Sequence, residues 1–481
     1  MNALLPVVSI ALSWLAGALV VRLLLPGRSD AHLAVQLGYG FFAGMALTVA
    51  LVAGFRILGL GMHWLPVAGI LVALSAAALF QGRRRAAGTD SAGGLRAWMS
   101  GAGRWQVGLL IALAAWVLAR VLLVGLEAGL RPLYAWDGWM HWSPKAKVWI
   151  ETGQWLEFVS RSGWLNDASR SAYTIRNWSY PEFVPLVQTW VLLPLERWDP
   201  VTFGYPWIAV FVALVPAAYG TARFSGFSPL AALLTAWLLV SLPFVHVHAA
   251  LPGYADLWLG AYVGAAAGSL MLAASLRQLR WVLIAAVFGV VCAWIKVPGA
   301  AWMLVVLGGV LAYLLPARVT GLLVAGAFVA LAVVLLIGVD LRIPGAGRVA
   351  LSTAGFDLPV IGQYDWQFNR VFAVILGQLL QGGNWHFLWP ACVIVYMIGI
   401  PAAIRDAGAR AAWLLAALGA CFLFAAFVLT SRGAAIESTQ ITHRAFLPLA
   451  ILAVMTLPAL VTATLRPKGR AESPTRNEPD S

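Results

Sequence analysis

The chain has 481 residues, of which 61% are hydrophobic and only 11% are charged. Soluble domains carry about 25% charged residues, so this composition excludes a water-soluble fold. Its net charge is +13, but much of the Arg and Lys lies in short segments between apolar runs, as the positive-inside rule expects. We therefore expect a lipid bilayer as the surrounding partner, and no nucleic acid.

Apolar runs of about 20 residues recur along the chain, and in lipid such runs form helices because only helices satisfy their own backbone hydrogen bonds. The sequence thus predicts an all-α, polytopic membrane protein with about 11–13 transmembrane helices. Candidate spans lie at about residues 3–25, 33–54, 64–81, 105–130, 201–221, 229–245, 255–276, 281–297, 299–316, 319–340, 385–403, 411–430 and 444–465.

Two stretches leave this count open. The neighbouring spans 281–297 and 299–316 are short and could form a re-entrant pair. The apolar stretch 181–195 has the length of an interfacial helix, yet if it crossed the membrane every later loop would change side.

Basic residues between the spans orient the chain. The segment 82–104 contains five Arg and one Asp, and further basic residues follow the last span from Arg466 to Arg470. Placing both on the cytoplasmic side puts the N-terminus outside and a disordered tail, 466–481, inside. Two large loops, 131–200 and 341–384, are then extracytoplasmic, and within the second Asp365–Gln381 is predicted to be an interfacial helix.

The first large loop carries residues that suggest chemistry. Asp137 follows the span 105–130 within a few residues, so it should lie at the membrane surface. Ser143 as N-cap and Pro144 predict a short helix over 144–152 that ends at Gly153. Lys145 in its first turn would oppose the helix dipole. It could hold a phosphate together with the free N–H groups, or extend toward lipid headgroups.

Aromatic residues surround this aspartate. Membrane interfaces enrich Trp in general, but Trp136, Trp139 and Trp142 flank Asp137 closely, with His141 among them. Flat aromatic faces beside a carboxylate suit a sugar ring, which offers apolar C–H faces and hydroxyl groups.

Further polar elements follow at predicted extracytoplasmic helix ends. Tyr180-Pro181 opens the stretch 181–195, and His246-Val247-His248 precedes Tyr254-Ala255-Asp256. Two histidines without a third ligand are a weak metal signal.

Two cations stand close to apolar segments. Lys296 lies in an otherwise uncharged region and needs an acid or a phosphate as its partner. His443-Arg444 opens the last span, where the guanidinium could bind a phosphate bidentately or anchor the helix at the interface.

The order of these elements resembles the GT-C superfamily of integral-membrane glycosyltransferases, particularly bacterial members related to the protein mannosyltransferase and lipid A aminoarabinose transferase group. The shared order is a carboxylate after a span, an interfacial helix, a Tyr-Pro helix start, a Tyr-Ala-Asp element, a Lys-x-x-Gly element and a late Arg. The resemblance covers about 105–460. It divides the chain into additional N-terminal helices with a basic loop (1–104), a GT-C-like catalytic domain (105–465) and the tail.

The resemblance implies transfer of a sugar from a polyprenyl-phosphate donor to a lipid, glycan or protein acceptor on the outer face of a bacterial inner membrane. It assigns a base or acceptor-orienting role to Asp137, and acceptor or metal positioning to Asp256. Lys296, Arg444 and Lys145 would bind the lipid phosphate. The remaining candidates for substrate binding are His141, Trp136, Trp139, Tyr180, Tyr254 and His443.

The chain departs from the family pattern in places. Glu182 stands where relatives often have a second proline, and Val297-Pro298 stands where they often have Asn-Glu. The first-loop motif holds the single aspartate Asp137 rather than an acidic pair, which argues against a metal, so no cofactor is expected, although a divalent cation remains an alternative. The competing hypothesis is a transporter or flippase for a lipid-linked or anionic substrate, against which the absence of an internal repeat counts.

Overall fold

The computed structural model describes residues 4–25, 27, 29–85, 94–169, 171–344, 347–359, 361–381, 383–437 and 439–466. Within these residues nine helices are long and apolar enough to cross a membrane, or ten if one bent pair counts as a span. The chain is therefore a multi-pass membrane protein, as its composition predicts. The predicted tail lies, apart from Arg466, outside the described residues.

Each of these nine helices coincides with a predicted span. They are α1 (Leu4–Leu24), α2 (Asp30–Ile57), α3 (Trp64–Arg85), α5 (Arg104–Leu130), α9 (Tyr205–Phe224), α12 (Asp256–Leu276), α15 (Ala317–Ile337), α19 (Ala407–Val428) and α20 (Thr439–Leu465).

The bent pair consists of α10 (Pro229–Ser241) and α11 (Pro243–Ala250), which meet at 61°. Pro243 cannot donate the hydrogen bond that would continue α10, so the helix breaks there. The ring of His386 hydrogen bonds to the freed carbonyl of Ser241 at 3.1 Å.

The remaining predicted spans are shorter than a membrane requires. They form α13 (Leu279–Ile295), α14 (Gly299–Leu314) and the successive helices α17 (Leu388–Ile398) and α18 (Ile400–Arg405). At 1.5 Å per residue α13 and α14 are about 25 Å long, less than the ~30 Å of a bilayer core. The predicted 11–13 spans therefore exceed the nine or ten found among the described residues.

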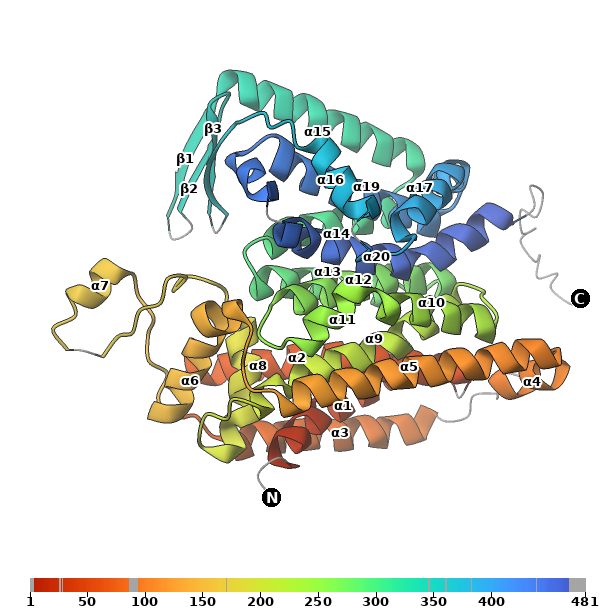
Figure 1. Cartoon of the computed structure of the whole chain (residues 1–481), viewed down its shortest axis with the longest axis horizontal. Coiled ribbons are helices and arrows are strands. Elements are labelled where there is room, and N and C mark those ends of the chain that lie inside the picture. Colours follow the sequence, from red (N-terminus) through yellow and green to blue (C-terminus); the bar gives the residue numbers. More distant parts are fainter. Residues whose placement is uncertain are drawn as a thin grey trace, which may run out of the picture.

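Figure 1 shows that the helices run roughly side by side, with connections gathered at two opposite ends. One end, which we call the loop end, carries α6 (Ser143–Thr152), α7 (Arg161–Leu165) and the β-strands. The other end carries α4 (Leu95–Gly101) and the end of α20. Both large loops thus lie at one end, opposite α4, a described part of the basic segment, as the charge pattern predicts.

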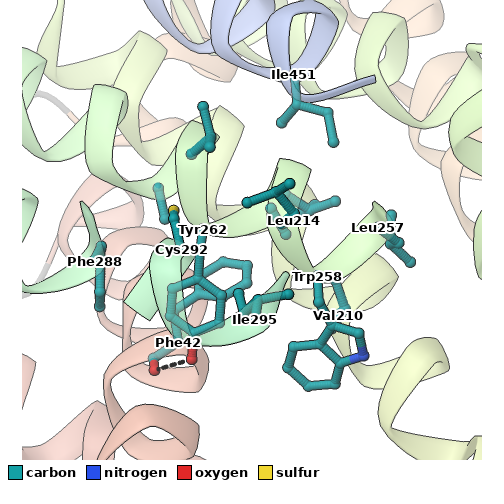
Figure 2. Close-up of a cluster of buried hydrophobic side chains, with 14 of the residues drawn as sticks. Phe42, Val210, Leu214, Leu257, Trp258, Tyr262, Phe288, Cys292, Ile295 and Ile451 are labelled. Atoms are coloured by element: carbon teal, nitrogen blue, oxygen red, sulfur yellow. Dashed lines mark hydrogen bonds between the residues drawn. The ribbon is translucent and has the colours of Figure 1, made fainter. Parts of the chain in front are cut away.

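Helix α12 forms the centre of the helix bundle, and 83% of it is buried. Its Trp258 and Tyr262 pack among Phe42, Phe288 and Cys292 from α2 and α13, and the Tyr262 hydroxyl donates to the Phe42 carbonyl at 2.9 Å (Figure 2). Helix α2 also contacts α9, where Tyr39 and Thr221 hydrogen bond at 2.6 Å. The N-terminal helices therefore pack directly on the helices that follow residue 104.

The first large loop contains the predicted helix but starts it differently. A π-helical turn, η1 (Gly138–Trp142), runs directly into α6, so Trp142 rather than Ser143 precedes the helix. The Ser143 hydroxyl instead accepts a hydrogen bond from Gln188 at 3.1 Å, which corrects its predicted role as N-cap. Gly153 ends α6 with a φ of 66°, as predicted.

The apolar stretch 181–195 forms α8 (Phe183–Leu192) followed by a short 3₁₀ turn, Leu193–Leu195. All ten residues of α8 are buried, and α8 contacts α1, α2 and α6. It is too short to span the membrane and lies inside the protein rather than at the interface.

The second large loop contains an antiparallel sheet that the sequence analysis did not predict. Its strands β1 (Val339–Ile343), β2 (Gly347–Leu351), β3 (Gly355–Leu358) and β4 (Gly362–Asp365) pair in chain order. The predicted interfacial helix is wrong in its first half, because Asp365 ends β4 and α16 covers only Phe372–Gln381. The segment between the two elements contains the polar residues Gln367, Asn369 and Arg370.

Candidate active site

Two close-packed glycines bring the candidate acids together. Gly138, at the start of η1, lies against Gly253 of the loop before α12, and a Cβ added at Gly138 would be 3.2 Å from the Gly253 Cα. Gly253 also has a φ of 117°, which residues with a side chain rarely adopt. Asp137 precedes Gly138 and Asp256 begins α12, so this backbone contact holds both carboxylates at the loop end.

Arg444 of α20 bridges the two carboxylates. Its Nε and Nη2 donate to Oδ2 of Asp256 at 3.1 and 2.7 Å, and Nη2 also donates to Oδ2 of Asp137. Lys296, in the break between α13 and α14, donates to Oδ1 of Asp256 at 2.7 Å. We call these four residues the ion-pair cluster, and its two acids and two bases balance in formal charge.

The two acids differ in whether a carboxylate oxygen remains free to accept a hydrogen bond. Both oxygens of Asp256 accept hydrogen bonds from cations, and its side chain is only 7% exposed. Among the described residues, Oδ1 of Asp137 accepts none, and its side chain is 13% exposed. Oδ1 of Asp137 can therefore accept a further hydrogen bond, whereas both oxygens of Asp256 are already bonded to Lys296 and Arg444.

Aromatic and histidine side chains line the cluster. The guanidinium of Arg444 lies 4.7 Å from the centre of the Tyr254 ring, a cation–π contact. Burial raises the pKa of Tyr254, and the charge of Arg444 opposes that rise. His248 packs beside Tyr254 with its rings 5.4 Å apart, and its Nε2 is buried without a hydrogen-bond partner in the described structure.

The aromatic residues predicted near Asp137 divide into two groups. Trp136 and Trp139 are 64% and 57% exposed, so their rings are available beside the carboxylate. Trp142 is fully buried and packs against Tyr180.

His141 and Tyr180 lie together beside the acid. Their rings are 5.8 Å apart, and the His141 ring hydrogen bonds to Asn177. Burial lowers the pKa of His141, and the charge of Asp137 opposes that shift. Neutral His141 is therefore favoured at pH 7.

His443 precedes Arg444 but faces another way. It is buried, and its Nδ1 accepts a hydrogen bond from the Trp385 indole at 2.9 Å. The structure thus gives His443 a packing contact that orients the start of α20, rather than a place among the charged groups.

Lys145 lies in a second cluster. Its ammonium donates to the Tyr180 carbonyl at 3.0 Å and to Glu182 at 3.3 Å, and its side chain is only 2% exposed. Arg56, in the last turn of α2, also pairs with Glu182. Burial lowers the pKa of Lys145 and the charge of Glu182 opposes this. The sequence placed Lys145 at a helix N-terminus but gave no means of identifying Glu182 as its partner.

The sequence analysis missed Arg432, which connects the second large loop to the site. Arg432 donates to the Tyr364 hydroxyl of β4 at 2.6 Å, and it is exposed. Burial raises the pKa of Tyr180, while the nearby charge of Arg432 opposes the shift and that of Asp137 adds to it. Arg432 follows the apolar run of α19 as an isolated cation before the last span, and that position was the available signal.

The described residues contain no group of three or more His, Cys, Asp or Glu that could hold a metal ion. No family model, curated protein or solved structure matches the chain. The resemblance to GT-C glycosyltransferases therefore stays a prediction from sequence, and the function has to be argued from the ion-pair cluster itself.

Proposed function

We propose that the chain is a glycosyltransferase that moves a sugar from a polyprenyl-phosphate donor to an acceptor hydroxyl. The observation that carries the proposal is the convergence of Asp137, Asp256, Lys296 and Arg444 from separate segments at one end of the membrane helices. Groups of this kind can remove a proton and stabilise a departing phosphate, which is what the transfer requires.

In the proposed step, the acceptor oxygen attacks the anomeric carbon and its proton passes to Oδ1 of Asp137. The bond between the anomeric carbon and the phosphate oxygen breaks, and the polyprenyl phosphate leaves with the electron pair. Trp136 and Trp139 provide exposed aromatic faces for the sugar ring. This displacement inverts the configuration at the anomeric carbon.

The two acids and two bases of the ion-pair cluster already balance, so the negative charge of a donor phosphate requires at least one additional cation. Arg432 meets that need because it is exposed and lies close enough to Tyr180 for its charge to act on the phenol. We assign Arg432 to the phosphate together with Arg444. The loop end then faces the extracytoplasmic side of a bacterial inner membrane, consistent with the basic segment at the opposite end.

The test is donor consumption by the purified protein in nanodiscs. A panel of radiolabelled polyprenyl-phosphate sugars is offered with and without candidate acceptors, and release of label from the lipid fraction is measured. Asp137→Asn should lower the rate by about 10²–10⁴-fold, the usual share of a general base. Glu157→Gln, at an exposed acid of the same loop, should leave the rate unchanged. Consumption that does not depend on Asp137 would refute the assignment of the site.

A transporter or flippase is the second candidate, and the break between α10 and α11 favours it. Discontinuous helices often line substrate sites in transporters, and α11 carries His248, which packs against Tyr254 beside Arg444. The same labelled lipids in proteoliposomes distinguish the two functions. Label that crosses the bilayer with its sugar still attached supports transport, whereas label that leaves the lipid supports transfer.

A further inference from the structure

A cleft at the loop end lies apart from the ion-pair cluster. It has a volume of about 370 Å³ and is lined by Ala53, Arg56 and Ile57 of α2, Glu182 and Leu186 at α8, and Trp294 of α13. Its walls are mostly apolar, and its two charged residues are Arg56 and Glu182. This volume is at the lower end of the ~300–1,000 Å³ typical of ligand sites.

The charges beside this cleft do not balance. Arg56 and Lys145 both pair with the single carboxylate of Glu182, which leaves one excess positive charge. The ion-pair cluster has no such excess. In the partly buried setting of this cleft, where Arg56 and Glu182 are 25% and 27% exposed, an excess charge attracts an anion more strongly than it would in water.

Arg56 is held so that part of its guanidinium stays available. Its Cζ atom lies 4.8 Å from the centre of the Trp149 ring, a cation–π contact that restricts its orientation. Only Nη1 hydrogen bonds within the described chain, to Glu182. The remaining N–H groups can bind a phosphate oxygen, the geometry for which Arg is best suited.

The apolar wall indicates that the anion belongs to a lipid. Ile57 is 84% exposed and the adjoining Leu58 is 73% exposed, both at the end of a membrane span. A hydrocarbon chain of the bilayer can lie along this surface while its headgroup reaches Arg56. Leu186 and Trp294 extend the apolar wall around the charged pair.

We propose that the cleft between α2, α8 and α13 binds the phosphate headgroup of an anionic membrane lipid on Arg56, with Glu182 competing for the same guanidinium. This site goes beyond the proposed sugar transfer and does not depend on it. A compact phosphate monoester fits the volume, and the lipid chain follows the apolar wall of α2.

The test is native mass spectrometry of the full chain released from detergent micelles, titrated with dioleoyl phosphatidic acid. Arg56→Gln should weaken binding by about tenfold or more, because it removes a charge-assisted hydrogen bond. Glu182→Gln should instead tighten binding, because it removes the competing carboxylate. Arg161→Gln, an exposed cation of the same loop, is the matched control and should change nothing.

Several outcomes overturn the proposal. Unchanged lipid affinity in Arg56→Gln would show that the lipid does not bind in this cleft. Weaker binding in Glu182→Gln would show that Glu182 does not compete with the lipid for Arg56. Equal occupancy by phosphatidylcholine would exclude an anionic preference, and equal affinity for inorganic phosphate would exclude the lipid. Because Glu182→Gln is expected to gain affinity, a gain cannot arise from misfolding. Arg444→Gln should retain lipid binding even where donor consumption is lost, so this result is independent of the proposed function.

Discussion

Helices α12 and α15 are both 21 residues long, yet they have opposite surroundings. In its 18-residue apolar window α15 has a mean hydropathy of 2.7 with only 6% of the residues buried, whereas the window of α12 has a mean hydropathy of 1.6 with 83% buried. The more apolar helix is the more exposed, because lipid solvates apolar side chains as well as a protein interior does. In this pair of helices, the higher hydropathy goes with the exposed helix and the moderate hydropathy with the buried one.

Small residues explain how α12 packs. Gly260 and Gly264 lie against Ile451 of α20, and Gly268 lies against Tyr39 of α2. Small residues let membrane helices approach closely enough for van der Waals contact. In α15, Gly321 and Gly326 have open space where a Cβ would be. Glycine thus allows close helix packing in α12, whereas the glycines Gly321 and Gly326 of α15 make no such contact.

The largest expected difference between the two helices is in activity. Asp256, the first residue of α12, fixes Lys296 and Arg444, so Asp256→Asn should misplace both cations and lower kcat for donor consumption by about 100-fold. Arg318→Gln, in the first turn of α15, should leave kcat within twofold. Steady-state rates with each variant check this, and an equal loss in both would contradict the division of roles.

A smaller difference is expected in stability, from a matched pair of leucines. Leu270 of α12 is fully buried and Leu322 of α15 is 72% exposed. Leu270→Ala should lower the free energy of unfolding by about 2–5 kcal/mol, since it leaves a cavity. Leu322→Ala should lower it by less than about 0.5 kcal/mol, the range of surface changes. Unfolding titrated with SDS in mixed micelles measures both, and a large loss at Leu322 would show that α15 has a protein partner.

The smallest expected difference concerns glycine. A Cβ at Gly268 would overlap the Tyr39 hydroxyl, which hydrogen bonds to Thr221, so Gly268→Ala should cost about 1–3 kcal/mol. Gly326→Ala should be neutral or stabilise by about 0.5–1 kcal/mol, because alanine favours helix. The double variant Tyr39→Phe with Gly268→Ala should recover part of the loss. No recovery in the same SDS titration would place the clash elsewhere.

Much of the fold could be predicted from the sequence because apolar run length is set by the bilayer. All nine long helices fall on predicted spans. The sheet of the second loop was missed although Gly347, Gly355 and Gly362 each begin a strand, which is a hairpin signal. Its strands are short and none of their residues is fully buried, so no strong alternation distinguishes them from an irregular loop.

The site was predictable in part. A cation in an apolar region needs an acid as its partner, and on this basis an acidic partner was expected for Lys296. The structure brings Lys296 together with Asp256, and Arg444 joins Asp256 to Asp137. The partner of Lys145 was not predictable, because pairing with Glu182 depends on how α6 packs against α8. The same holds for Arg432, whose contact with Tyr364 depends on the unforeseen sheet.

The contact between Gly138 and Gly253 has a mechanical consequence. Because main chain lies against main chain there, a side chain at either position would push apart the segments that bear Asp137 and Asp256. The spacing of the two carboxylates thus depends on both positions remaining glycine.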